Sequence, residues 1–465
     1  MKLPVSLRAV FFFTASVLAS AAEPRWNILH IVADDLRNSL GCYGNPAVKS
    51  PNLDRLAARA MRFDRAYCTY PVCNPSRASF MSGLRPETTG VLDNVTPTRA
   101  RQKDHVFLPE LFRQSGYRTI KVGKIYHTGD AFEDPRSWDT DIRETNDAKN
   151  PPEKQILRRQ GPDGIVLRAA DEETWEGFVA RRAAALLEEA ARQGKPFYVA
   201  AGFRMPHRPY IAPEKYFALY NPDELAPRPG PAGHAAKLPK LALTYLVGGK
   251  KFPDERPGDT IAAYYAAISY MDAQVGVLLA TLDRLKLWGR TIVVFQSDHG
   301  YHLGEHGGLW HKMTLFDETT RIPLLVAAPG RKPGVSRALV ETVDLYPTLA
   351  GLCGLTAPKN LEGTSFAPLL EDPLRPWKRA VFAVVTRAGG QADANVGNPN
   401  ELGRVVFDGR WRYIAWPDGT AQLYDHHSDP LEYENLAADP RARAQLGRMQ
   451  QLLASGWKAA LPPRS

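Results

Sequence analysis

Apolar runs rich in β-branched residues alternate along this chain with segments of helical periodicity. This alternation indicates an α/β protein built on a mostly parallel sheet that helices flank. The predicted strands are Trp26–Val32, Tyr117–Val122, Phe197–Gly202, Thr291–Ser297 and Pro323–Ala328. The predicted helices, most of which end at a glycine or a charged turn, are Asn52–Ala60, Leu108–Gln114, Thr174–Gln193, Ile261–Leu287 and Asp344–Leu352.

The pattern changes after about Leu370, where short strand-like pieces separated by turns replace the long alternation. These pieces predict a smaller antiparallel sheet, closed by a helix at Pro440–Lys458. Its strands are Ala380–Thr386, Gly403–Phe407, Trp411–Trp416 and Ala421–Tyr424. We therefore expect a catalytic domain at residues 22–370 and a C-terminal subdomain at 371–465. The segment Asn221–Pro257, rich in Pro, Gly and Lys, is predicted to be a long surface excursion.

The N-terminus has the three parts of a secretory signal. Lys2 and Arg8 are basic, Ala9–Ser20 is apolar, and small residues at 19–21 form a cleavage site. The alternative is a membrane anchor, but an apolar run of about 12 residues falls short of the ~20 that span a bilayer. We expect residues 1–21 to be removed and the mature protein to be exported, periplasmic or extracellular, without stable membrane insertion.

Charge and cysteine content narrow the functional classes. The formal net charge of +9 suits an anionic substrate, although a solvated basic surface has the same composition. No dense Lys/Arg run with interleaved aromatic residues argues for nucleic acid. Four cysteines, at positions 42, 68, 73 and 353, are too few for a disulfide framework in 465 residues. A Cys42–Cys68 bridge is one alternative, and packed thiols are the other.

Charged and imidazole side chains follow four of the predicted strands. Since ligands of open α/β sheets bind beyond the carboxyl ends of the strands, we expect these side chains to share one rim. They are Asp34, Asp35, Lys124, His127, His207, Asp298 and His299.

The acidic residues of this rim predict a metal site. Asp34, Asp35 and Asp298 would repel one another unless a cation lay among them. Oxygen-rich ligation favours Ca²⁺ or Mg²⁺, and the imidazole of His299 would soften the site. An Asp-Asp pair alone is more often a capped turn, and the arrival of Asp298 and His299 at the same rim reverses that balance.

The stretch from Tyr70 to Pro86, YPVCNPSRASFMSGLRP, places a cysteine before a short helical run. Pro75 in the first turn and Gly83 at the end predict a helix at Ser76–Ser82. Its free backbone N–H groups would stabilise an oxyanion beside Cys73, and Arg77 would add an anion contact. A thiolate nucleophile fits such a place, but a metal held by aspartates prefers oxygen ligands to sulfur. This conflict suggests that position 73 does not remain a thiol.

The sequence resembles the type I, formylglycine-dependent sulfatases of the alkaline phosphatase superfamily, whose Cys-x-Pro-x-Arg signature is Cys73-Asn74-Pro75-Ser76-Arg77 here. The resemblance covers nearly the whole mature chain. Within the family it is most similar to the iduronate-2-sulfatase group. The motifs that carry it include VADDLRNSLGCYG, GLRPETTGV, GKIYH, MPHRPY and SDHGYHLGEHGGLWHK.

The resemblance implies a fold, a modification and a set of roles. The fold would be alkaline-phosphatase-like, and Cys73 would be oxidised to formylglycine by a formylglycine-generating enzyme. The hydrated aldehyde would attack the sulfur of a sulfated sugar or polysaccharide, and its second hydroxyl would allow sulfate to leave. Implied metal ligands are Asp34, Asp35, residue 73, Asp298 and His299. Implied catalytic residues are Cys73, Arg77, Lys124, His127 (general base), His207 and Lys312, with Lys124, His207 and Lys312 contacting substrate.

Two other functions stay open at this point. One is a phosphate-ester or phosphonate hydrolase of the same superfamily. The other is a noncatalytic binder of sulfated glycans, in which Cys73 is never converted. Three further histidines at 302, 306 and 311 lie near the metal motif and are expected to be structural, as is His30 within an apolar strand. Tyr301, Trp310 and Trp416 are candidates for stacking on sugars or for the core.

Overall fold

A computed structural model describes residues 25–243, 246–247, 250–251, 256–390 and 392–463, so the predicted signal peptide 1–21 lies outside it. Its centre is an eight-stranded sheet in which only β16 runs antiparallel to its neighbours, as the sequence predicted for a mostly parallel sheet. The strands are, in spatial order, β17 (Gly334–Ser336), β2 (Met61–Phe63), β16 (Leu324–Ala327), β12 (Thr291–Ser297), β1 (Asn27–Ala33), β8 (Phe197–Gly202), β4 (Arg118–Gly123) and β5 (Thr140–Ile142).

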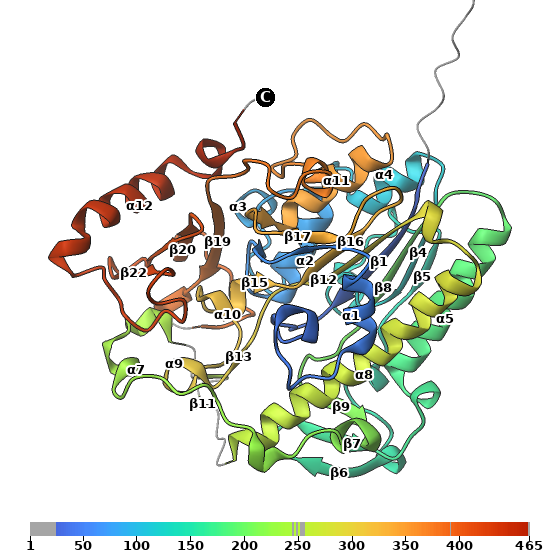
Figure 1. Cartoon of the computed structure of the whole chain (residues 1–465), viewed down its shortest axis with the longest axis horizontal. Coiled ribbons are helices and arrows are strands. Elements are labelled where there is room, and N and C mark those ends of the chain that lie inside the picture. Colours follow the sequence, from blue (N-terminus) through green and yellow to red (C-terminus); the bar gives the residue numbers. More distant parts are fainter. Residues whose placement is uncertain (1–24, 244–245, 248–249, 252–255, 391, 464–465) are drawn as a thin grey trace, which may run out of the picture.

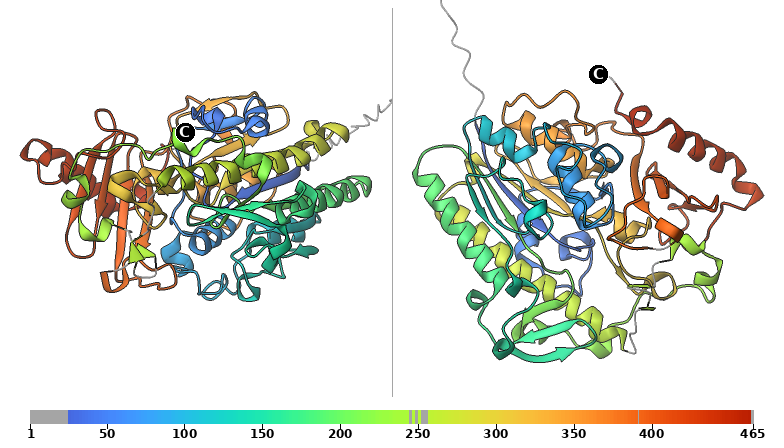
Figure 2. Two further views of the ribbon diagram at one scale, coloured as in Figure 1. Left: turned by 90° about the horizontal axis from the view of Figure 1, so that it is seen from below. Right: turned by 180° about the vertical axis from the view of Figure 1, so that it is seen from behind.

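Helices cover both faces of this sheet (Figures 1 and 2). Along β1, Leu29 and Ile31 point into one core and Ile28 and Val32 into the other, because successive strand residues face opposite sides. The first core is closed by α1 (Pro51–Ala57), α5 (Trp175–Arg192) and α8 (Pro257–Arg284). The second is closed by α2 (Cys73–Ser82), α4 (Leu108–Gln114) and α11 (Leu345–Leu352). The predicted central strands and helices are confirmed within a few residues.

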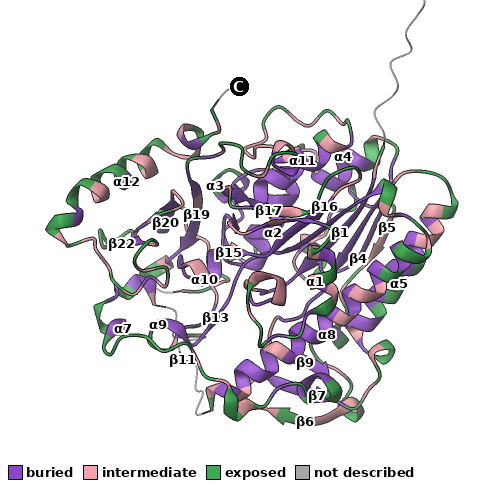
Figure 3. Cartoon of the chain, viewed as in Figure 1, coloured by how far each residue is buried: buried purple, intermediate pink, exposed green. Residues whose placement is uncertain are grey.

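The helix α8 is long and apolar enough to cross a membrane by length and composition. In its most apolar 18-residue window 72% of the residues are buried inside the protein, against α1, α5 and β9 (Tyr210–Pro213) (Figure 3). Its apolar surface therefore belongs to the core.

The C-terminal part forms the predicted four-stranded antiparallel sheet, at the orange-to-red end of Figure 1. Its strands are β19 (Val381–Thr386), β20 (Leu402–Phe407), β21 (Trp411–Ala415) and β22 (Ala421–Asp425). The helix α12 (Arg443–Ser455) packs on one face. The other face shares a core with Tyr70, Val72 and Leu315. The predicted domain boundary at residue 370 stays a prediction, and two apolar clusters join the two parts.

Several short elements were not predicted. A three-stranded sheet of β6 (Ile156–Gln160), β7 (Gly164–Leu167) and β9 lies at one end of α8. The described part of the predicted excursion is mostly irregular, with α7 (His234–Lys237) its longest helix. The remaining short elements are β3 (Ala66–Tyr67), α3 (Pro86–Thr89), α6 (Glu214–Phe217), β10 (Leu246–Val247), β11 (Lys250–Lys251), β13 (His302–Leu303), α9 (Glu305–Gly308), β14 (Trp310–His311), α10 (Asp317–Thr320), β15 (Arg321–Ile322) and β18 (Val340–Glu341).

Candidate active site

The carboxyl ends of β1, β4, β8 and β12 meet at one edge of the central sheet. Ala33 pairs with Ser297, and Gly202 pairs with both Val32 and Gly123. The residues that follow these strands, among them Asp34, Lys124, His207 and Asp298, therefore start from the same rim, as predicted.

Cys73 enters this rim as the first residue of α2, three residues earlier than the predicted helix start. The prediction placed Pro75 at the helix start, where proline is common. Pro75 instead occupies the third helical position, where it has no N–H to offer. The N–H of Asn74 donates to Asn94 Oδ1 at 3.1 Å. The expected row of free backbone N–H groups is thus reduced, and side chains supply most of the charge around Cys73.

Four side chains offer ligand atoms within 4.8 Å of one another: Asp34, Asp35, Cys73 and His299, all buried. Cys73 Sγ lies 3.3 Å from Asp34 Oδ1 and 3.5 Å from His299 Nε2. His299 Nε2 lies 3.2 Å from Asp35 Oδ1. Asp35 Oδ2 is buried and makes no hydrogen bond within the described residues. A buried carboxylate oxygen without a donor is costly, so this donor set fits a cation.

Asp298, the fifth predicted ligand, lies beside this group with both oxygens engaged. Its Oδ1 accepts from the N–H of Asp35 at 3.2 Å and of His299 at 2.9 Å. Its Oδ2 accepts from Arg77 Nε at 2.9 Å. Asp298 Oδ1 is 3.7 Å from His299 Nε2. The structure thus places Asp298 next to the cluster, and its ligation of a metal stays a prediction.

Two lysine ammonium groups lie at the nucleophile position. Lys312 Nζ lies 2.6 Å from Asp35 Oδ1 and 3.1 Å from Cys73 Sγ, and Lys124 is paired with Asp34 Oδ2. Burial and Asp34 act to raise the pKa of the Cys73 thiol, but Lys312 and Lys124 outweigh them and the pKa is lowered. Burial would lower the pKa of Lys312, yet the facing Asp35 raises it. An anionic oxygen at position 73 would meet the same two ammonium groups.

Arg77 is fully buried, and its guanidinium contacts other residues of the site rather than solvent. Besides Asp298, it donates through Nη1 to the carbonyls of Lys124 at 2.5 Å and Ile125 at 3.1 Å. Its Nη2 lies 3.6 Å from Asp34 Oδ1. Arg77 thereby connects three of the strand ends.

The two predicted catalytic histidines are both neutral in their surroundings. Burial and the nearby Lys124 lower the pKa of His127 to about 3, and its Nδ1 is buried without a hydrogen bond. Burial, followed by Lys312, lowers the pKa of His207. His207 Nε2 lies 3.9 Å from Asp35 Oδ2, while its Nδ1 faces both the carbonyl of Arg208 and the guanidinium of Arg204. A neutral imidazole at 127 is a base that can take up a proton.

Residues that the prediction missed position His207. Arg204 Nη2 lies 3.0 Å from His207 Nδ1, and Arg204 Nη1 lies 3.3 Å from Glu144 Oε1. Glu176 Oε1 accepts from the N–H groups of Arg204 and Met205, both at 3.1 Å. The strand-end rule could have found Arg204, since it follows β8. Glu176 lies in the first turn of α5 and does not follow a strand, so this rule could not find it.

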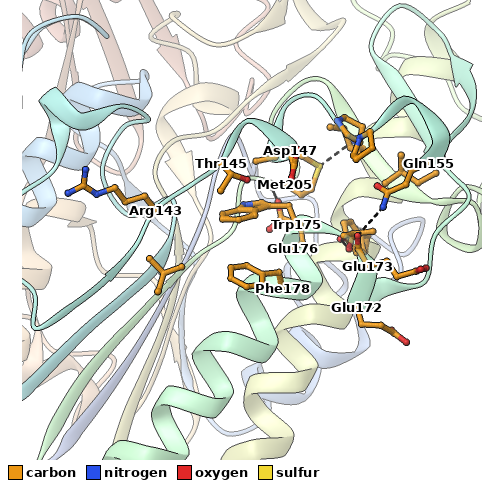
Figure 4. Close-up of a pocket in the computed structure, with 18 residues that line it drawn as sticks. Arg143, Thr145, Asp147, Gln155, Glu172, Glu173, Trp175, Glu176, Phe178 and Met205 are labelled. Carbon is orange, nitrogen blue, oxygen red and sulfur yellow. Dashed lines mark hydrogen bonds between the residues drawn. The ribbon is translucent and has the colours of Figure 1, made fainter.

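A cavity of about 450 Å³ lies beside Met205 and Glu176 (Figure 4). Met205, Glu176 and the ring pair of Trp175 and Phe178, whose centroids are 5.3 Å apart, belong to its lining. Its lining includes none of the predicted catalytic residues, so it is a separate space from the cluster around Cys73.

The structure also bears on the predictions for the cysteines, His30 and three aromatic residues. All four cysteines are free, so Cys42 and Cys68 are unbridged thiols. His30 is buried and bonded to Tyr198, as expected for a core residue. Tyr301, Trp310 and Trp416 are each 5% exposed or less, so their faces are not open to a sugar.

Comparison with known proteins decides the family. The sulfatase family model matches residues 26–355, which is most of the chain, and a model for the N-sulphoglucosamine sulphohydrolase C-terminal region matches 304–458. The chain belongs to the sulfatase family. It is a sulfate ester hydrolase. Human iduronate 2-sulfatase is 30% identical over 94% of each chain, and the choline-sulfatase of Rhizobium meliloti is 31% identical over 93% of this chain and 86% of its own.

Solved structures agree on the alkaline-phosphatase-like fold of this sulfatase. The phosphonate monoester hydrolase of Silicibacter pomeroyi superposes with a TM-score of 0.79 at 23% identity, covering 94% of this chain and 96% of its own. A protein solved with its substrate D-glucosamine-2-N,6-O-disulfate superposes with a TM-score of 0.73 at 22% identity, covering 93% of this chain and 97% of its own.

Proposed function

We propose that this sulfatase releases sulfate from a sulfated carbohydrate by means of formylglycine at position 73 and one divalent cation. The preferred cation is Ca²⁺, and Mg²⁺ is the alternative. The observation that carries the proposal is the surroundings of Cys73. Its side chain meets two aspartates, His299 and the ammonium of Lys312. Such a place activates an anionic nucleophile and neutralises the charge of a sulfuryl group.

Asp34, Asp35 and His299, with Asp298, would hold the cation. Their donor set is rich in carboxylate oxygens, which suits a hard cation and suits sulfur poorly. When bound, the cation would lower the pKa of an oxygen at residue 73 and draw charge from a sulfate oxygen. In its hydrated form, formylglycine would supply two hydroxyls where the thiol stands. Its formation requires a formylglycine-generating enzyme during maturation.

The chain's own residues would then handle protons and charge. Lys124 and Arg77 flank Asp34 and favour the ionised form of residue 73. Lys312 is protonated because Asp35 raises its pKa, whereas burial lowers the pKa of His207, so Lys312 would be the proton donor to the leaving alcohol. His207 would orient a sulfate oxygen. His127, neutral at physiological pH, would accept the proton of the second hydroxyl as sulfate leaves.

The substrate class rests on the relatives. Human and mouse iduronate 2-sulfatase are 30% and 33% identical to this chain, and an ulvan-active sulfatase of Formosa agariphila is 30% identical over 89% of it. We therefore propose a sulfated sugar or polysaccharide as substrate. The basic, apolar and small segments of residues 1–21 support export to the periplasm or the outside.

The phosphonate hydrolases of the same fold supply the rival activity. The experiment compares purified protein on an aryl sulfate, a sulfated disaccharide and an aryl phosphonate, with and without Ca²⁺. We expect kcat/KM to be highest on sulfate esters, and loss of turnover in Cys73→Ala. Faster turnover of the phosphonate would overturn the proposal in favour of that activity. Tight binding of the sulfated disaccharide without turnover would favour a noncatalytic binder.

A further inference from the structure

A second group of metal-ligating side chains lies outside the predicted catalytic centre. Donor atoms of His302, His306 and Glu318 lie within 4.8 Å of one another. His302 begins the β13–β14 hairpin, His306 is in α9, which lies between its two strands, and Glu318 lies on α10. We call these three residues the His302 cluster. The predicted mechanism uses none of them.

The hydrogen bonds around His302 fix which of its ring nitrogens carries the proton. The Thr319 hydroxyl donates to the carbonyl of Thr314 at 2.8 Å. The Thr314 hydroxyl must then donate to Thr319 Oγ1 at 2.9 Å, which leaves Thr314 Oγ1 to accept from His302 Nε2 at 2.8 Å. With the proton on Nε2, Nδ1 of His302 carries a bare lone pair.

That lone pair has no hydrogen-bond donor within the described residues, although the His302 side chain is fully buried. The nearby oxygen is Glu305 Oε2 at 3.6 Å, which is beyond ordinary hydrogen-bond distance. Glu305 Oε2 already accepts from the N–H of Leu303 at 2.6 Å. A buried lone pair that faces a carboxylate oxygen is repelled unless a proton or a metal ion lies between them.

The other two members face the same space. His306 Nε2 lies 3.3 Å from Glu318 Oε2, and His306 Nδ1 lies 3.1 Å from His234 Nε2. The His306 ring also stacks on Phe316, with centroids 4.0 Å apart. Both ring nitrogens of His306 therefore have a partner, and a metal ion at Nε2 would take the place of the proton that this nitrogen shares with Glu318. The second ring nitrogen of each ligand histidine in a metal site is commonly held by a neighbour, as His234 holds Nδ1 here.

Two carboxylates at the cluster line a cavity. Glu305 and Glu318 are part of the lining of a cavity of about 530 Å³ that also includes Arg37. Arg37 pairs with Glu305, so that carboxylate is already compensated. Glu318, which faces His306 Nε2 at 3.3 Å, supplies the remaining negative charge.

We propose that His302, His306 and Glu318 form a second metal site, separate from the catalytic one, that takes Zn²⁺. Two imidazole nitrogens and one carboxylate oxygen are the ligands Zn²⁺ accepts, and they leave one tetrahedral position for water or Glu305. The ion would tie the β13–β14 hairpin to α10. Because Lys312 directly follows β14, the site would fix the base of the hairpin that carries this catalytic lysine.

The test measures metal in a variant from which the catalytic ligands are removed. In Asp35→Asn/Cys73→Ser protein, stripped with a chelator and loaded with Zn²⁺ or Co²⁺, we expect one ion per chain by mass spectrometry. Bound Co²⁺ should show the visible absorption of tetrahedral nitrogen and oxygen coordination. Adding His302→Ala or Glu318→Gln should weaken binding at least about tenfold. Adding His427→Ala, which removes an exposed histidine elsewhere, should change nothing.

Glu318→Gln keeps the size of the side chain and guards against a folding defect in His302→Ala. Thr314→Val is a third variant, because it removes the acceptor that holds the His302 tautomer, and it should also weaken binding. If the background protein holds no stoichiometric ion, or if Glu318→Gln and Thr314→Val bind as tightly as the background, the proposal is wrong. The cluster is then a buried pair of ion-paired histidines.

Discussion

At the scale of single residues, the active site is a balance between buried carboxylates and buried cations. Asp34 faces Lys124 and Asp35 faces Lys312, so each charge is compensated only while its partner is present. Removing one partner of a buried pair leaves the other uncompensated. The same lysines are predicted to stabilise the transition state, and their loss should therefore affect rate more than substrate binding.

Lys312→Met tests this assignment. We expect kcat on an aryl sulfate to fall by about 10²–10³, the usual effect of losing a group that stabilises developing charge. Lys332→Met, at an exposed position, is the control and should keep full activity. Steady-state kinetics at saturating Ca²⁺ give the answer, and a Lys312→Met enzyme within about twofold of wild type would contradict the predicted role.

Glu176 makes a prediction about pH and stability. Burial, with Glu144 adding to it, raises the pKa of Glu176 to about 8 in the folded protein, against 4.5 as the ordinary value. The folded state therefore holds this proton more tightly than the unfolded state does. Its stabilising contribution is full below about pH 4.5 and falls as the pH rises to about 8, by up to about 1.4 kcal/mol per pH unit.

The isosteric variant Glu176→Gln should remove this pH dependence of the free energy of unfolding. Relative to wild type, its free energy of unfolding is expected to improve as the pH rises from 5 to 8. Denaturant unfolding of both proteins at several pH values measures the difference, in which the titration of other groups cancels. A difference that does not change with pH would mean that Glu176 is ionised in the folded protein.

At the scale of elements, the start of α1 depends on a side chain of another helix. Asp272, on α8, accepts from the N–H groups of Asn52 at 3.1 Å and Leu53 at 2.7 Å. These are N–H groups that a helix cannot satisfy by itself. Asp283, on the same helix, makes exposed ion pairs with Arg55 and Arg59 and accepts a hydrogen bond from Trp288 Nε1.

Asp272→Ala should therefore destabilise the protein by about 1–3 kcal/mol, because it leaves buried donors unpaired. Asp283→Ala should cost at most about 1 kcal/mol, as exposed ion pairs do. Thermal unfolding of the two variants beside wild type measures both effects, and equal shifts in Tm would refute the distinction.

The sequence predicted elements best where burial decides them. β8 and β12 were predicted to the residue because both are buried along their whole length, carry a central apolar run and are bounded by charged or turn residues. β6 was missed because Arg158 and Arg159 point to solvent, so no apolar run marks it. α2 was placed too late because proline is common at a helix start, whereas tertiary contacts extend this helix back to Cys73.

Residues of the candidate site could be predicted where a strand end marks their position. Asp34, Asp35 and His299 could be grouped because strand ends in a parallel sheet share a rim. Lys312 follows a short hairpin strand and was found only through the family resemblance. Glu176 could not be predicted, since its contact with the Met205 segment depends on how α5 packs on the sheet.

At the scale of the whole molecule, the C-terminal sheet completes the core around the catalytic part. Val384, Val405 and Ile414 of that sheet pack with Tyr70 and Leu315. A protein that ends at residue 370 would expose this face. We expect residues 22–370 alone to be insoluble or to unfold without a cooperative transition, by circular dichroism and calorimetry. A soluble fragment with a sharp Tm near that of the full chain would show that the parts fold independently.

The central claim is that position 73 becomes formylglycine and acts as the nucleophile. The most direct measurement is the mass of the tryptic peptide Ala66–Arg77 from protein expressed with a formylglycine-generating enzyme, read beside sulfate release from an aryl sulfate. We predict a loss of about 18 Da, as a thiol carbon becomes an aldehyde, located at residue 73 and not at Cys68. Turnover should rise with the converted fraction. Full turnover by protein whose Cys73 is entirely unmodified would contradict the account.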